Sequence, residues 1–96
     1  MRRFTTTISI RTQEVINYTV NVDATSVKQA AKKLRGLHKQ NKLIPLINSI
    51  VDNRGRYHNM YISEIDRVNS GDMIISTDLG GENFELSLKD TTPDLY

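Results

Sequence analysis

The chain has 96 residues, of which 38% are hydrophobic and 25% are charged, and these values predict a single domain with one modest core. It contains no cysteine, which excludes a disulfide framework and thiolate chemistry and makes a reducing cytoplasm the expected location. No apolar run approaches the roughly 20 residues that cross a bilayer, so we expect a soluble protein without membrane association.

The net charge of +2 is unevenly distributed along the chain. Residues 1–42 hold nine Lys and Arg against two acids, which gives +7, and residues 43–96 hold four against nine, which gives −5. This asymmetry permits a basic partner-binding face, an acidic one, or head-to-tail self-association.

Two N-terminal segments, residues 3–11 and 14–22, carry apolar residues at even positions and mostly Thr, Ser, Asn and Arg at odd positions. This alternation, rich in β-branched residues, predicts two half-buried strands. A hairpin at residues 12–13 would join them. We expect the polar face of their sheet to meet water or a partner.

A helix is predicted next, because Ser26 followed by Gln29 is a capping-box pattern, with Asp23 and Thr25 as alternative caps. Apolar residues then recur at helical spacing until Pro45 closes the segment. At about 100° per residue, five cations fall within roughly 80° of one another on a different side of this helix. They are Lys28, Lys32, Arg35, Lys39 and Lys42. This stripe predicts a surface that binds a partner or nucleic acid, or else a face that only meets water.

The rest of the chain predicts β structure. Residues 46–52 and 57–63 flank a hairpin turn, residues 63–68 are ambiguous between a helical turn and a strand, and strands are expected at 73–77 and 84–88. We therefore expect an α+β fold of order β-β-α-β-β-β-β, with one main helix packed on a small antiparallel sheet. The domain should span residues 1–89, with residues 90–96 as a loosely ordered tail.

Arginine, histidine and tyrosine gather between positions 54 and 61, as Arg54, Arg56, Tyr57, His58 and Tyr61. On one strand, Tyr57 and Tyr61 would share a face and His58 would lie opposite. The set could serve a metal-independent ribonuclease, with arginines for transition-state charge and His or Tyr for proton transfer. The alternative is a half-buried strand with a basic turn. The absence of cysteine and the 20 residues between the two histidines argue against a metal site, and we expect no cofactor.

The stretch VNVDATSVKQAAKKL, following a predicted hairpin, resembles the strand-then-helix opening of several small proteins of phages and mobile elements. The short chain without Cys or Trp is similar in character to phage accessory proteins, and this resemblance implies a protein that binds and modulates host machinery. We therefore expect a non-enzymatic module that docks on a partner protein through the cationic stripe and residues 54–61. Direct RNA or DNA binding is the alternative, and a ribonuclease the third possibility. A sheet edge could also pair with a partner or a second copy.

Overall fold

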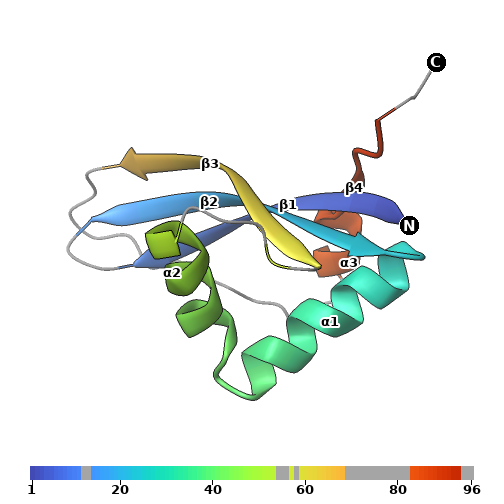
Figure 1. The fold of residues 1–96 in the computed structure, drawn as a ribbon, viewed down its shortest axis with the longest axis horizontal. Coiled ribbons are helices and arrows are strands. Elements are labelled where there is room, and N and C mark those ends of the chain that lie inside the picture. Colours follow the sequence, from blue (N-terminus) through green and yellow to red (C-terminus); the bar gives the residue numbers. More distant parts are fainter. Residues whose placement is uncertain (12–13, 54–56, 58, 69–82, 94–96) are drawn as a thin grey trace.

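The computed structural model describes residues 1–11, 14–53, 57, 59–68 and 83–93 (Figure 1). The elements, in chain order, are β1 (Arg2–Arg11), β2 (Val15–Ala24), α1 (Val27–Lys39), α2 (Leu43–Asn53), β3 (Met60–Val68), α3 (Asn83–Ser87) and β4 (Lys89–Asp90). The four strands form an antiparallel sheet of order β3-β2-β1-β4, and the helices lie against one of its faces. The predicted α+β class is confirmed, while the predicted order of elements differs in detail.

The predicted N-terminal hairpin is confirmed by a continuous ladder from the Arg2–Ala24 pair to the Arg11–Val15 pair. Paired residues share a face, so Phe4 with Val22 and Ile8 with Tyr18 point towards the helices, where all four are buried. Odd positions of β1 lie on the opposite face of the sheet, here called the open face because none of the described helices covers it. The apolar positions of the alternating sequence therefore lie on the face of the sheet that the helices cover.

Helix α1 begins as predicted, because the Ser26 hydroxyl oxygen accepts from the Gln29 amide at 3.2 Å. The Gln29 side chain returns to accept from the Thr25 amide at 2.6 Å, one residue before the cap. The helix ends at Lys39 because Asn41 takes a left-handed conformation with φ of 55°. The Lys42 amide then donates to the Leu37 carbonyl at 2.9 Å, closing a Schellman turn.

The predicted strand at 46–52 is wrong, because these residues belong to helix α2. Its buried residues are Leu43, Ile47 and Ile50, whose i, i+4, i+7 spacing is helical. Pro45, expected to end the preceding segment, lies in the first turn of α2, where a missing backbone N–H breaks no helical hydrogen bond.

Strand β3 begins later than predicted, because the chain turns between Tyr57 and Met60. These two residues exchange backbone hydrogen bonds of 3.0 and 3.2 Å. The segment 63–68, ambiguous in sequence, continues this strand, which forms one edge of the sheet within the described residues. The predicted strand at 73–77 lies outside the described residues.

The predicted strand at 84–88 is also wrong, because residues 83–87 form the short helix α3. Phe84 and Leu88 are buried, whereas Leu86 is 81% exposed, so the three apolar residues do not share one strand face. Strand β4 follows and pairs with Phe4 and Thr5 of β1, so the expected boundary at residue 89 falls within this pairing.

One hydrophobic core fills the space between the sheet and the helices. Its most deeply buried large side chains are Leu34, Leu43, Ile47, Val20 and Val22, contributed by α1, α2 and β2. Within the described ranges, no helix is long and apolar enough to cross a membrane.

Candidate functional site

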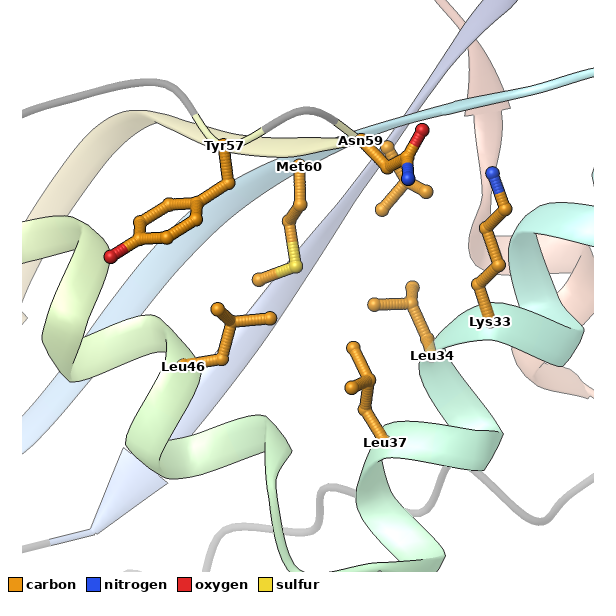
Figure 2. Close-up of a pocket in the computed structure, with 8 residues that line it drawn as sticks. Lys33, Leu34, Leu37, Leu46, Tyr57, Asn59 and Met60 are labelled. Atoms are coloured by element: carbon orange, nitrogen blue, oxygen red, sulfur yellow. The ribbon is translucent and has the colours of Figure 1, made fainter.

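A pocket of about 420 Å³ opens between α1, α2 and the start of β3 (Figure 2). Its apolar lining consists of Val22, Leu34, Leu37, Leu46 and Met60. Figure 2 shows the leucines of α1 and α2 pointing into the space that Met60 enters from the sheet side. Leu37 and Leu46 are only partly buried, so they form the accessible walls, whereas Leu34 and Met60 belong to the buried core.

Three polar residues complete the pocket lining: Lys33, Tyr57 and Asn59. The Lys33 ammonium donates to the backbone carbonyl of Asp23 at 2.9 Å. Because an ammonium has three N–H donors, this bond leaves capacity for an acceptor on a bound molecule. The pocket therefore combines an apolar wall with a positive charge beside it.

Tyr57 is held against α2 by two hydrogen bonds. Its hydroxyl lies 2.6 Å from the Ser49 hydroxyl and accepts from the Asn53 amide at 3.2 Å. The Ser49 bond is the main reason that the pKa of Tyr57 is lowered, and the Asn53 bond adds to it. These bonds fix the ring as a pocket wall although the side chain is exposed.

The five cations predicted as one stripe have different surroundings. Lys28, Lys32 and Lys39 are exposed on α1. Arg35 instead pairs with Glu85 of α3 at 3.2 Å, and its guanidinium carbon lies 5.8 Å from the centre of the Phe84 ring. Lys42 is exposed but follows the end of α1. The predicted stripe is thus three exposed lysines on the helix, one arginine packed against α3 and one lysine beyond the helix.

Lys33 was not among the residues that the sequence singled out. The signal available was its spacing from Leu37, since residues four apart share a side of a helix. Lys33 therefore stands beside the apolar stripe, on the side of α1 that faces the pocket rather than α3.

The predicted cluster at 54–61 is only partly within the described residues, because Arg54, Arg56 and His58 lie outside them. The expectation that Tyr57 and Tyr61 share a face is wrong. Tyr57 lines the pocket beside Met60, whereas Tyr61 follows Met60 in the strand and points to the other face of the sheet. Because of the turn before Met60, Tyr57 is not part of the strand in which side chains alternate between faces from Met60 onward.

On the open face, the guanidinium carbon of Arg3 lies 5.0 Å from the centre of the Tyr61 ring. Tyr61 is paired in register with Asn21, which is buried and accepts from the Thr5 hydroxyl at 2.6 Å. This cation–π contact and the neighbouring hydrogen bond order the polar face of the central strands.

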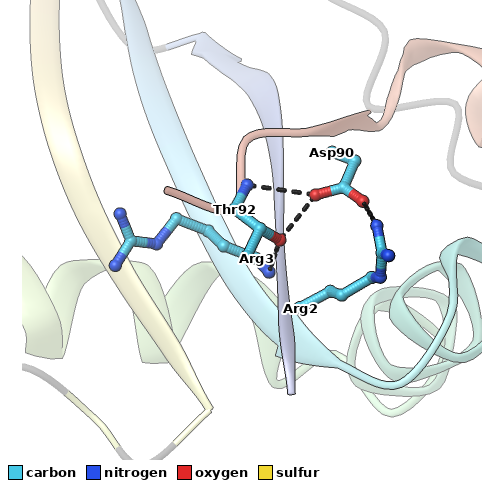
Figure 3. Close-up of polar contacts among 4 residues, drawn as sticks. All are labelled: Arg2, Arg3, Asp90 and Thr92. Carbon is cyan, nitrogen blue, oxygen red and sulfur yellow. Dashed lines mark hydrogen bonds and ion pairs between the residues drawn. The ribbon is translucent and has the colours of Figure 1, made fainter. Parts of the chain in front are cut away.

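The chain after α3 is joined to β1 by polar contacts (Figure 3). The Asp90 carboxylate pairs with Arg2 and accepts from both the amide and the hydroxyl of Thr92, at 3.0 and 2.6 Å. The Thr92 hydroxyl oxygen in turn accepts from the Arg3 amide at 2.9 Å. The Thr92 side chain is the largest cause, and its amide and Arg2 further causes, that lower the pKa of Asp90 to about 2. We interpret this cluster as structural, because its polar groups form hydrogen bonds and an ion pair with one another.

Among the residues that the structure describes, no group of three His, Asp or Glu side chains is placed to hold a metal ion. Comparison with family models found no match, and neither curated proteins nor solved structures gave one. The function must therefore be inferred from the chemistry of the surface itself.

Proposed function

We propose that the chain is a non-enzymatic binding module that docks on a partner protein through the α1–α2 side of its fold. The observation that carries this proposal is the open apolar pocket of about 420 Å³ between these helices. A soluble domain of this size gains stability by closing such gaps, and a pocket with apolar walls and a few polar groups is a common form of binding site.

The surroundings of the pocket suit a protein partner. Protein interfaces combine an apolar centre with a polar rim, and aromatic residues are enriched in them. Here Leu37 and Leu46 supply apolar walls, Tyr57 supplies an ordered aromatic ring, and Lys33 supplies charge. The resemblance of residues 20–34 to small phage proteins supports a phage-type inhibitor or modulator as the particular instance.

The proposal is tested by a pull-down with the tagged full chain from a cell lysate divided into nuclease-treated and untreated halves. A stoichiometric protein retained in both halves, and through a high-salt wash, is the expected result. Recovery of nucleic acid alone, lost on nuclease treatment, would contradict the proposal.

Direct nucleic-acid binding is the second candidate, favoured by the exposure of Lys28, Lys32 and Lys39 on α1. Each phosphate contact adds salt-sensitive affinity without sequence preference. If this candidate holds, Lys32→Ala will make the slope of log affinity against log salt concentration shallower by about one unit, because one phosphate contact is lost. An unchanged salt dependence would remove Lys32 from such an interface.

A further inference from the structure

We infer that the α1–α2 pocket accepts a large apolar side chain carried by an acidic segment of the partner protein. This inference rests on the proposed docking function and adds the chemistry of the partner. It follows from three properties of the pocket: its size, the fixing of its walls and the sign of the charge around it.

The size of the pocket allows a large apolar side chain to be inserted. A volume of about 420 Å³ is near the lower end of the range of roughly 300–1,000 Å³ that small-molecule sites occupy. The pocket is lined on both helix sides by leucines, Leu34 and Leu37 from α1 and Leu46 from α2 (Figure 2). An aromatic or leucine side chain inserted between them would contact apolar groups on several sides.

The inner part of the pocket and two of its polar residues are held by contacts within the chain. Leu34 is fully buried and Met60 is 4% exposed, so the inner part of the pocket is held by the core. Tyr57 is held by Ser49 and Asn53, and Lys33 by the carbonyl of Asp23. Side chains that are already ordered lose little entropy on binding, which favours affinity from a small contact area.

The charge around the pocket selects an acidic segment. Residues 27–53, which include both helices, hold six Lys and Arg and one acid, Asp52, so six minus one gives +5, or +4 once the ion pair of Arg35 with Glu85 is counted. Lys33 lies in the pocket lining itself and uses one of its three donors on Asp23. A carboxylate of the partner next to the inserted side chain could accept a hydrogen bond from a second N–H of Lys33. The positive charge of the other lysines on α1 would favour further acidic residues in the partner segment.

None of the described residues that line this pocket is acidic, although Asp23 adjoins Val22 of the lining and its backbone carbonyl accepts from Lys33. Glu85 pairs with Arg35 and Asp90 pairs with Arg2, while Glu64 and Asp66 belong to β3 beyond the turn that lines the pocket. The lysines of α1 would therefore repel a basic segment, and the described pocket lining holds no acidic side chain that could pair with it.

The test uses the full chain labelled with ¹³C in its methionine methyl groups, because Met60 lies in the pocket lining. The chain has three methionines, and Met60→Leu assigns the Met60 signal. Three short peptides are compared: one with a Trp-Leu centre and Asp/Glu flanks, one with the same centre and Lys/Arg flanks, and one with a Ser-Ser centre and Asp/Glu flanks. Affinity is measured from the shift of the Met60 signal.

We expect the acidic Trp-Leu peptide to shift the Met60 signal, with each of the other peptides at least about tenfold weaker. Lys33→Gln should weaken the acidic peptide by about threefold to fivefold, as for a partly exposed ion pair. The matched control Lys32→Gln, outside the pocket lining, should change its affinity by less than about twofold. The Met1 signal, from a residue 82% exposed and outside the pocket, should stay unshifted.

The inference is overturned if the acidic Trp-Leu peptide leaves the Met60 signal unchanged, or if the three peptides bind equally. Equal effects of Lys33→Gln and Lys32→Gln would also overturn the part assigned to Lys33. These failures are distinguishable from failure of the docking function. If the peptides fail while the chain retains a lysate protein after nuclease treatment, docking stands and only the chemistry assigned to the partner segment is wrong. If neither binds, both proposals are wrong.

Discussion

Arg35 of α1 donates to Glu85 of α3 at 3.2 Å, and this ion pair joins the cationic helix to the C-terminal part of the fold. The contact brings together residues 50 positions apart. It also shows why the five predicted cations are not equivalent: Arg35 is engaged inside the molecule, while Lys28, Lys32 and Lys39 face solvent. Its consequences for stability are measurable.

A double-mutant cycle with Arg35→Ala and Glu85→Ala should give a favourable coupling of about 0.2–1 kcal/mol, because both side chains are partly exposed and water screens the pair. Their side-chain exposures are 27% and 36%. Urea unfolding of the four proteins measures the coupling. A control cycle that combines Lys32→Ala with Glu85→Ala should give no coupling energy. A coupling energy of zero between Arg35 and Glu85 would contradict the contact.

Gly36→Ala should stabilise the chain by about 0.5–1 kcal/mol, since glycine weakens the interior of a helix relative to alanine. Gly36 lies within α1, and a Cβ added there would have no atom within 4 Å. The methyl group therefore adds no clash to offset the gain in helix propensity. Thermal and urea unfolding measure the change. A lower midpoint would show that the backbone at Gly36 is constrained in another way.

Ile47→Ala should lower the free energy of unfolding by about 2–5 kcal/mol, while Ile44→Ala should lower it by less than about 1 kcal/mol. Ile47 is fully buried under the sheet, whereas Ile44 on the same helix is 41% exposed. Both substitutions remove the same atoms, so the difference between the two variants measures the effect of burial on the free energy of unfolding. Similar losses for the two variants would contradict the orientation of α2.

Asp90 should titrate with a pKa of about 2, well below its ordinary value of 3.8, because Thr92 and Arg2 stabilise the carboxylate. Its contribution to stability is therefore fully present above about pH 4 and is lost as the pH falls towards 2. Carboxyl ¹³C NMR of the folded chain measures the midpoint. Thr92→Val should raise the pKa more than Arg2→Gln does, because the Thr92 side chain is the largest cause. A midpoint near 4 in the unmodified chain would contradict the contacts.

The N-terminal hairpin and α1 could be predicted because each has a long, regular signal. In the sequence the alternation extends over residues 3–11 and 14–22, and any shift of one position in the pairing of β1 would expose Phe4 and Ile8. In α1 the capping residues and the apolar spacing agree, and Ser26 caps the helix as expected.

The later elements could not be assigned because their apolar patterns fit two structures. In residues 84–88, Phe84 and Leu88 are compatible both with alternation and with an i, i+4 spacing, and only the exposure of Leu86 decides for a helix. In residues 43–53, Pro45 suggested an end to helical structure, although proline is equally suited to a first helical turn.

The pocket depends on tertiary contacts that no local pattern encodes. The Schellman turn at Asn41 sets α2 beside α1, and the turn before Met60 brings Tyr57 to the same place. Lys33 and Tyr57 come from distant segments, so only the folded chain places both in one lining. The cations of α1 were visible in sequence, whereas their division between solvent, α3 and the pocket was not.

The central claim is tested most directly by the nuclease-treated pull-down repeated with Leu37→Gln and Ile65→Gln. Leu37 lines the pocket, whereas Ile65, 42% exposed on β3, is outside its lining and serves as the matched control. Circular dichroism melts establish that both variants are folded. We expect Leu37→Gln to lose the retained protein and Ile65→Gln to keep it. Equal retention by both folded variants would contradict docking through the α1–α2 pocket.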